Sequence, residues 1–205
     1  MKYDPNIHHR RSIRLKGYDY SQAGRYFVTI CVQNKEHLFG KIINGEMILN
    51  DAGKMVAKWC AELSHKFPDI TSEIYVVMPN HFHVIIVNHG APVPVPVVPV
   101  VPVGANLRVC PNESNEHENI SGDISGDILG EHVGSPLRSV IQWFKTMTTN
   151  EYIRGVKTLG WQRFDKKLWQ RDYWERIIRD EQSYQRIANY IINNPANWKN
   201  DKFHK

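Results

Sequence analysis

The chain has 205 residues, of which 41% are hydrophobic and 23% charged, and its net charge is +5. These values are typical of a globular protein with one sizeable core. There is no apolar run near the roughly 20 residues of a membrane helix, no apolar signal stretch at the N-terminus and no CxxC pair. We therefore expect a single cytoplasmic domain over residues 1–205. We exclude a secreted disulfide scaffold, a membrane protein and a zinc ribbon.

Charge is distributed unevenly, with +4 over residues 1–25, −5 over residues 88–135 and +5 over residues 151–205. Positive charge at both ends favours attraction to a phosphate backbone, although a basic, well-solvated surface has the same pattern. Residues 1–25 are interpreted as a basic arm. Its candidate phosphate contacts are Arg10, Arg11, Arg14 and Lys16.

The first half of the chain predicts strands around one helix. Residues 26–32, 74–78 and 82–87 are rich in β-branched and aromatic side chains, as buried strands are. Asn44-Gly45 separates two short apolar runs and predicts a hairpin, because both turn positions need a positive φ. Residues 50–66 predict a helix, because their apolar side chains recur at spacings of three and four residues. Either Asn50 or Asp51 can serve as its N-cap.

Residues 88–135 are interpreted as a flexible insertion between two folded halves. Residues 91–103 are almost entirely valine and proline, and five prolines deny a sheet its amide donors, so extended polyproline-like chain is expected. The polar, repetitive residues 112–134 are typical of mobile chain.

Helical spacing resumes at residues 137–144, and residues 181–194 predict a last helix that Pro195 ends. Strands, hairpin and helices together indicate an α+β fold. Its simplest form is an antiparallel sheet with helices on one face.

His81 and His83 are the first candidate site. Because they lie two residues apart in a predicted strand, they project from one face, opposite Phe82, Val84 and Ile86. Two imidazoles held in this way can bind one divalent cation, which can polarise a phosphoryl oxygen. The pattern alone also fits two half-exposed histidines near a strand end.

Tyr190 and Asn194 lie one turn apart on one face of the last predicted helix. A phenol beside a cation can act as a nucleophile, and the asparagine carbonyl can complete the coordination. A core tyrosine and an ordinary Asn-Pro helix stop are the alternatives. Two other tyrosines compete. Tyr184 lies about 120° away round the helix, and Tyr173 has no polar partner one turn later.

Several blocks of the sequence resemble the REP-associated tyrosine transposases of the HUH (His-hydrophobic-His) superfamily of single-strand transposases and nickases. The similarity covers about residues 8–90 and 136–198. The blocks that carry it are residues 78–83 (MPNHFH), 169–181 (WQRDYWERIIRDE), 190–195 (YIINNP), 8–20 and 26–31.

The resemblance implies a ferredoxin-like sheet, with the histidine pair on a central strand and the tyrosine on a C-terminal helix packed over it. It also implies cleavage of single-stranded DNA near a palindromic hairpin, with Mg²⁺ or Mn²⁺, through a 5′-phosphotyrosine and a free 3′-hydroxyl. Carried over, His81 and His83 are metal ligands, Tyr190 is the nucleophile, and Asn194 is the third ligand or an orienting group. Because related transposases include dimers that exchange the tyrosine helix, both a monomer and a homodimer are compatible with the resemblance.

Within residues 169–179, tryptophans alternate with arginines, as in surfaces that bind unstacked bases and phosphates. The candidates for DNA contacts are Arg171, Trp174, Arg176 and Arg179, with core packing as the alternative for Trp174.

The runner-up function is a hairpin-binding regulator of the same fold that does not cleave DNA. The complete set of His81, His83, Tyr190 and Asn194 favours the enzyme, because a pure binder has no need of it. A structural metal protein lacks a fourth ligand, and an RNA-recognition sheet lacks its aromatic signature.

Overall fold

The computed structural model describes residues 15, 17–91 and 134–204. The predicted contacts Arg10, Arg11, Arg14 and Lys16 lie outside the described residues, as do residues 92–133 of the predicted insertion. In the part of the chain that the structure describes, no helix combines the length and the hydropathy that a membrane-spanning segment requires.

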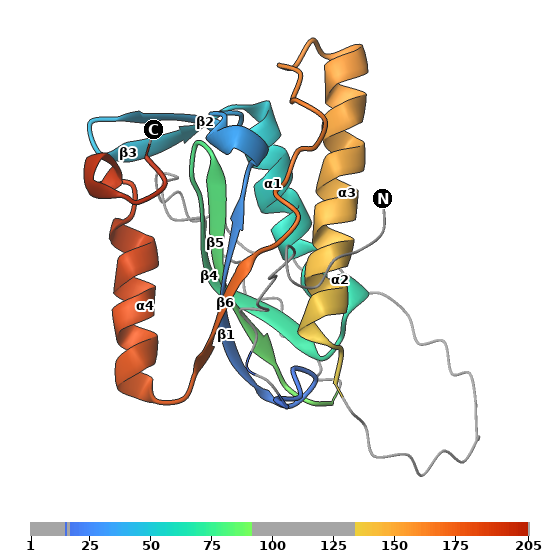
Figure 1. Cartoon of the computed structure of the whole chain (residues 1–205), viewed down its shortest axis with the longest axis vertical. Helices are drawn as coiled ribbons and strands as arrows, with labels where there is room; N and C mark the ends of the chain where they lie inside the picture. The colour runs from blue at the N-terminus through green and yellow to red at the C-terminus, as the bar shows by residue number, and fades with distance from the viewer. Residues whose placement is uncertain (1–14, 16, 92–133, 205) are drawn as a thin grey trace, which may run out of the picture.

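A four-stranded antiparallel sheet forms the centre of the fold, with strand order β4-β5-β1-β6 (Figure 1). Its strands are β1 (Gly24–Cys31), β4 (Ile70–Val77), β5 (His81–Asn88) and β6 (Trp174–Ile178). The helices are α1 (Asp51–Ala61), α2 (Leu63–Lys66), α3 (Leu137–Thr158) and α4 (Glu181–Asn193), with 3-10 turns η1 (Gln33–Lys35) and η2 (Trp198–Asn200).

The chain order of these elements is the split βαβ arrangement of ferredoxin-like folds. Helices α1 and α2 lie in the connection from β1 to β4, and α3 lies in the connection from β5 to β6. The predicted α+β ferredoxin-like fold is therefore confirmed, with His81 and His83 on the central strand β5. The predicted placement of the helices on one face is wrong, because the apolar side chains of α4 pack on the opposite face, with Ile85.

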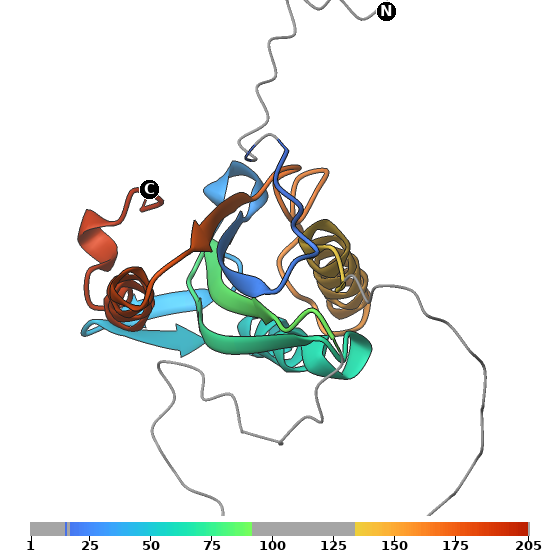
Figure 2. The ribbon, with the colours of Figure 1, turned by 90° about the horizontal axis from the view of Figure 1, so that it is seen from below.

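The two faces of the sheet are covered by different helices. Figure 2 shows α1 and α3 on one side of the sheet and α4 on the other. On β5, Phe82, Val84 and Ile86 pack in the larger core with α1 and α3, whereas Ile85 packs with α4 in a smaller cluster. His81 and His83 share the face of Ile85, as the alternation along the strand predicts.

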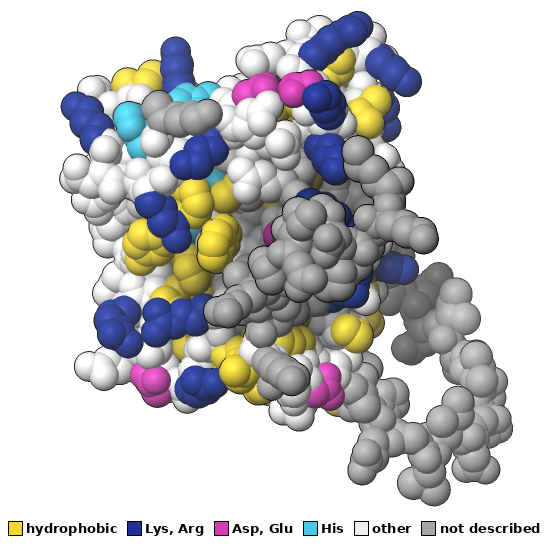
Figure 3. All heavy atoms as spheres, in the orientation of Figure 1, with side chains coloured by type: hydrophobic (Ala, Val, Ile, Leu, Met, Phe, Trp, Pro, Cys, Tyr) yellow, Lys and Arg dark blue, Asp and Glu magenta, His cyan; other side chains and the backbone are white. Residues whose placement is uncertain are grey.

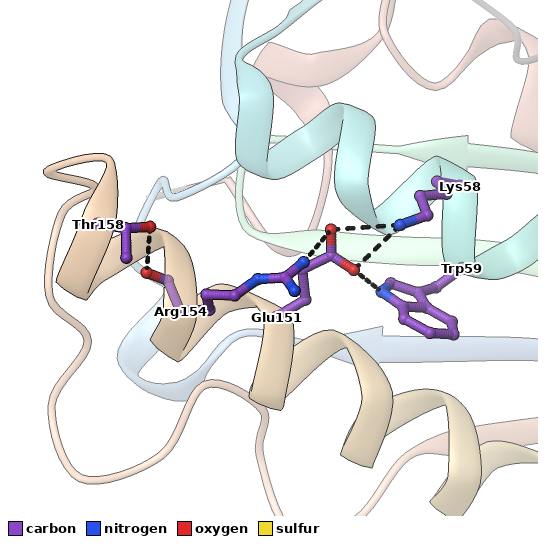
Figure 4. A network of polar contacts seen from close by, with 5 residues as sticks. All are labelled: Lys58, Trp59, Glu151, Arg154 and Thr158. Atoms are coloured by element: carbon purple, nitrogen blue, oxygen red, sulfur yellow. Dashed lines mark hydrogen bonds and ion pairs between the residues drawn. The ribbon is translucent and has the colours of Figure 1, made fainter.

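The α1–α3 layer is held by packing and by one partly exposed polar network. Phe82 stacks on Phe144 of α3 with ring centroids 5.1 Å apart. Glu151 of α3 accepts hydrogen bonds from Nε1 of Trp59 at 2.7 Å and from Nζ of Lys58 at 3.3 Å, and both partners belong to α1 (Figure 4). These contacts fix the helices against the face opposite the histidines.

Two local predictions are confirmed in the first half of the chain. Strands β2 (Gly40–Ile43) and β3 (Glu46–Leu49) form the hairpin, with positive φ at both Asn44 (52°) and Gly45 (82°). Asn50 caps α1, and its Oδ1 accepts a hydrogen bond from the Gly53 amide at 2.9 Å. The predicted single helix differs from the structure, because it is divided at Glu62 into α1 and α2.

The two described ends of the predicted insertion are joined at the end of β5 far from His81. Asn88 donates to the Ser135 carbonyl at 3.0 Å and accepts from the Gly90 amide at 2.9 Å. Ser135 Oγ donates to Asp69 Oδ1 at 2.8 Å. The chain therefore leaves and re-enters the fold at one place.

Candidate functional site

The histidine pair is fully buried, at 0% exposure for His81 and 1% for His83, with ring centroids 4.5 Å apart. This rules out the alternative of two half-exposed histidines. Each ring makes a hydrogen bond through Nδ1. The partner of His81 is Asn80 Oδ1 at 2.9 Å, and the partner of His83 is Thr29 Oγ1 at 2.8 Å. Such partners fix the orientation of imidazoles that ligate metals.

Asn80 also determines which nitrogen of His81 carries the proton. Its Nδ2 donates to the carbonyls of Phe203 at 2.9 Å and of Lys35 at 3.3 Å, which orients the amide. Asn80 Oδ1 can then only accept, so Nδ1 of His81 donates and Nε2 keeps its lone pair. This nitrogen is buried and has no hydrogen-bond partner within the described residues.

Tyr190 brings its hydroxyl to this pair from α4. Its oxygen lies 3.3 Å from Nε2 of His83 and donates to Asp201 Oδ2 at 3.2 Å. Asp180 caps α4 by accepting from the Ser183 amide at 2.7 Å, and Ile187 anchors the helix in the smaller core cluster. Tyr190 itself is 40% exposed, so its hydroxyl is held at the histidines and remains accessible from outside.

Asn194, the C-cap of α4, lies at the same point. It is 2% exposed and its Nδ2 donates to Asp201 Oδ2 at 2.8 Å. Its Oδ1 is buried and makes no hydrogen bond within the described residues. The structure thus brings together all four residues that the sequence singled out.

Asp201 completes the cluster and was missed by the sequence analysis. It follows η2, and its Oδ1 accepts from the Phe203 amide at 2.6 Å. Ligand atoms of His81, His83 and Asp201 all lie within 4.8 Å of one another, so these three residues can hold a metal ion. Two buried acceptors, Nε2 of His81 and Oδ1 of Asn194, lack partners, each at a cost of about 1–3 kcal/mol that a cation would relieve.

The protonation states suit cation binding. Burial lowers the pKa of His81 to about 4, against the opposing effect of the Asp201 carboxylate. Burial, followed by the neighbouring His81, lowers the pKa of His83 well below its usual value. Both imidazoles are therefore neutral near pH 7, which is the form that binds metals. Burial and the Asp201 carboxylate raise the pKa of Tyr190 to about 12, so its phenol is protonated.

The competing tyrosines pack elsewhere. The ring of Tyr184 lies under the Arg25 guanidinium, 4.6 Å from its centroid, and Tyr173 packs against the larger core on the other face of the sheet. Among the three candidates, Tyr190 is the one whose hydroxyl contacts the histidine pair.

The predicted DNA contacts of residues 169–179 that the structure describes lie on the surface. Trp174 is 54% exposed, so it does not pack in the core, and Nζ of Lys202 lies 5.9 Å from its ring centroid. Arg171 and Arg179 are exposed. Arg176 lines a cavity of about 490 Å³ that Tyr190 and Asp201 also line.

No protein-family model matches the chain. An uncharacterized protein of Haemophilus influenzae is 36% identical over 206 residues, which span 99% of this chain and 97% of that protein. Two solved structures are similar at lower identity. A REP-associated tyrosine transposase bound to a REP hairpin aligns with a TM-score of 0.49 and 16% identity, over 92% of this chain and 74% of that one. A Deinococcus radiodurans R1 protein described as a candidate transposase aligns with a TM-score of 0.42 and 10% identity, over 89% and 97%.

Proposed function

The chain belongs to the same family as the Haemophilus influenzae protein, and we propose that it is a tyrosine transposase of the REP-associated type. In this proposal it cleaves and rejoins single-stranded DNA beside a hairpin-forming repeat. The observation that carries the proposal is the meeting of a phenol with two neutral imidazoles and a carboxylate. The Tyr190 hydroxyl lies 3.3 Å from His83 Nε2 and 3.2 Å from Asp201 Oδ2.

The residues that would hold a divalent cation are His81, His83 and Asp201, with Asn194 as a further oxygen ligand. Their mixture of imidazole nitrogen and oxygen ligands is compatible with Mn²⁺ or Mg²⁺. A bound cation supplies a Lewis acid that withdraws charge from the scissile phosphate. Asn80 and Thr29 hold the two rings in place during the reaction, because each binds the nitrogen that faces away from the site.

Tyr190 is the proposed nucleophile. Its hydroxyl donates to Asp201 Oδ2, so this carboxylate both orients the phenol and is placed to accept its proton. The phenolic oxygen forms a bond to phosphorus as the bond from phosphorus to the 3′-oxygen breaks, and the 3′-oxygen leaves as a hydroxyl after taking up a proton. The diester is exchanged and not hydrolysed, so rejoining needs no nucleotide cofactor.

The DNA contacts proposed beside the site come from β6 and its flanks. Trp174 offers an exposed ring on which a base can stack, and Arg176 faces the same side of the sheet two residues later. Arg171 and Arg179 lie exposed at the two ends of this segment and are suited to contact phosphates.

A cleavage assay on labelled hairpin oligonucleotides with single-stranded flanks tests the proposal. With Mn²⁺ or Mg²⁺, we expect a shorter strand ending in a 3′-hydroxyl and a protein-linked strand that survives denaturation, and we expect neither in EDTA. Tyr190→Phe should abolish both products, whereas the matched control Tyr184→Phe on the same helix should retain them. Tight hairpin binding without a covalent product in any metal would contradict the enzyme and leave the hairpin-binding regulator.

A further inference from the structure

A cavity beside Tyr190 is only partly used by the proposed chemistry. Its volume is about 490 Å³, within the range of about 300–1,000 Å³ typical of small-molecule sites. One end is formed by His83, Tyr190 and Asp201 of the metal cluster. The rest is lined from β1, β6, α4, η2 and the segment after η2, by Phe27, Arg176, Ser183, Arg186, Ile187, Asn200 and Lys202.

The charges around this cavity favour an anion. Arg176, Arg186 and Lys202 line it, and the carboxylate among its lining residues, Asp201, is already bonded to Tyr190 and Asn194. Within the described part of the chain, none of these three cations lies within 4 Å of a carboxylate oxygen, although the pKa of the nearby Asp180 is lowered by its hydrogen bonds with Ser183 and, after them, by Arg186 and Arg176. Arg186 instead donates to Ser183 Oγ at 3.0 Å, and Lys202 Nζ lies 4.7 Å from the Phe203 ring centroid.

The inner surface of the cavity is apolar and aromatic. Phe27 projects from β1 with its ring 5.3 Å from His83 and 6.1 Å from Tyr190, and Ile187 lies one turn before Tyr190 on α4. Figure 3 shows hydrophobic side chains over α4 and β6 with Lys and Arg side chains around them. An apolar floor with a cationic rim suits one ligand chemistry, a flat base with phosphates on either side.

We infer that this cavity seats the nucleotide next to the scissile phosphate in an unstacked conformation. Its base lies against Phe27 and Ile187, and Arg176, Arg186 and Lys202 bind its phosphates. This inference rests on the proposed function, because the cavity opens onto the Tyr190 hydroxyl and its occupant is therefore a neighbour of the reacting phosphate. Arg186 is a binding residue in this account and has no part in the chemical step.

The test uses the full chain with Tyr190→Phe as the parent, so that binding is measured without cleavage. Hairpin oligonucleotides carry one neutral methylphosphonate at each position flanking the cleavage site in turn. At one position we expect the parent to lose about tenfold in affinity, as for a lost charge-assisted hydrogen bond. Arg186→Gln should bind the unmodified DNA about tenfold more weakly and lose nothing more at that position. For Arg186→Gln, the slope of log affinity against log salt concentration should be smaller in magnitude than the parent's by about 0.7, as for one lost phosphate contact on single-stranded DNA.

Arg163→Gln is the matched control. It removes the same charge as Arg186→Gln, but Arg163 is exposed and does not line the cavity. It should bind and respond to every methylphosphonate as the parent does. The inference is overturned if Arg186→Gln remains as sensitive as the parent at every position, or if an abasic nucleotide at the sensitive position binds as well as the intact one. If the coupling appears but the wild type forms no covalent adduct, the cavity stands and the proposed function fails. If the wild type forms the covalent adduct but the coupling is absent, the proposed function stands and the assignment of the cavity to a nucleotide fails.

Discussion

The hydroxyl oxygen of Tyr190 lies 3.3 Å from Nε2 of His83, although the two residues are 107 positions apart in the chain. The contact depends on the sheet and on α4 together, because β5 fixes the ring and the packing of α4 against the smaller core fixes the phenol. It gives the proposed reaction its nucleophile at the proposed metal cluster, and the predictions below test the parts of this arrangement separately.

Asp201→Asn should weaken Mn²⁺ binding by at least about tenfold, a loss that even groups which only orient ligands can cause. The substitution removes the charge of the only carboxylate in the described cluster and keeps its shape. Isothermal titration with Mn²⁺ measures the affinity, with Asp165→Asn as an exposed control of the same chemistry. Unchanged affinity in Asp201→Asn would exclude Asp201 from the ligand set.

Asn50→Ala should lower the free energy of unfolding by about 1–2 kcal/mol, as the loss of a helix cap does. The alanine removes both the acceptor for the Gly53 amide and the donor to the Leu38 carbonyl, which bond at 2.9 Å each. Urea denaturation measures the change. Asn50→Asp keeps the acceptor for the Gly53 amide and loses only the donor, so it should lower the free energy of unfolding by less than Asn50→Ala does. Equal losses for the two variants would show that the cap contributes nothing to stability.

The partly buried Lys145 should make the stability of the protein depend on pH between about 8 and 10.5. Burial lowers its pKa from the usual 10.5 to about 8, and the Asp172 carboxylate opposes this shift. Its Nζ donates hydrogen bonds to the carbonyls of Gln170 and Arg171. Between these two pH values the unfolded chain holds more protons than the folded one, so the contribution of Lys145 to stability rises as pH rises from 8 toward 10.5.

The measurement is the difference in unfolding free energy between the wild type and Lys145→Met at pH 7, 8, 9 and 10. Taking the difference cancels the groups that do not interact with Lys145. The measurements stop at pH 10, below the pKa of about 11 to which burial raises the neighbouring Cys31. The difference should move in favour of the wild type as pH rises, and a flat difference would mean that the Lys145 pKa is not lowered.

Replacing residues 92–133 by a short Gly-Ser linker should leave the fold and the cleavage activity intact. Asn88, Asp69 and Ser135 already join the flanking chain at the end of β5 opposite His81. We expect the Tm to change by less than about 3 °C, equivalent to about 1 kcal/mol for a protein of this size. Thermal melts and the hairpin cleavage assay check this, and loss of cleavage with an unchanged Tm would give the segment a functional role.

Much of the fold was predictable because it is encoded at short spacing. The Asn44-Gly45 turn, the Asn50 cap and the shared face of His81 and His83 each follow from residues that are close in the chain. The division of the first helix at Glu62 carries no Gly or Pro signal and was not predicted.

Asp201 was not predictable for a different reason. It lies beyond the Pro195 helix stop, in a segment with no periodic pattern. Its position depends on the chain turning back across β5, where Trp198 and Phe203 pack on the His81 ring at 5.9 Å and 4.7 Å. An acidic residue that reaches a site through such packing leaves no spacing signal, whereas Tyr190 and Asn194 share a helix face and could be found.

The most direct test of the central claim is mass spectrometry of the protein–DNA adduct. After reaction with a hairpin substrate and Mn²⁺, nuclease and trypsin would leave a nucleotide on one peptide. Trypsin separates the candidates, because Tyr190 is the only tyrosine in residues 187–199 and Tyr184 lies in residues 180–186. The account predicts a nucleotide joined through its 5′-phosphate to the peptide of residues 187–199, and fragmentation should locate this modification at Tyr190. The same modification on another tyrosine, with residues 187–199 unmodified, would contradict it.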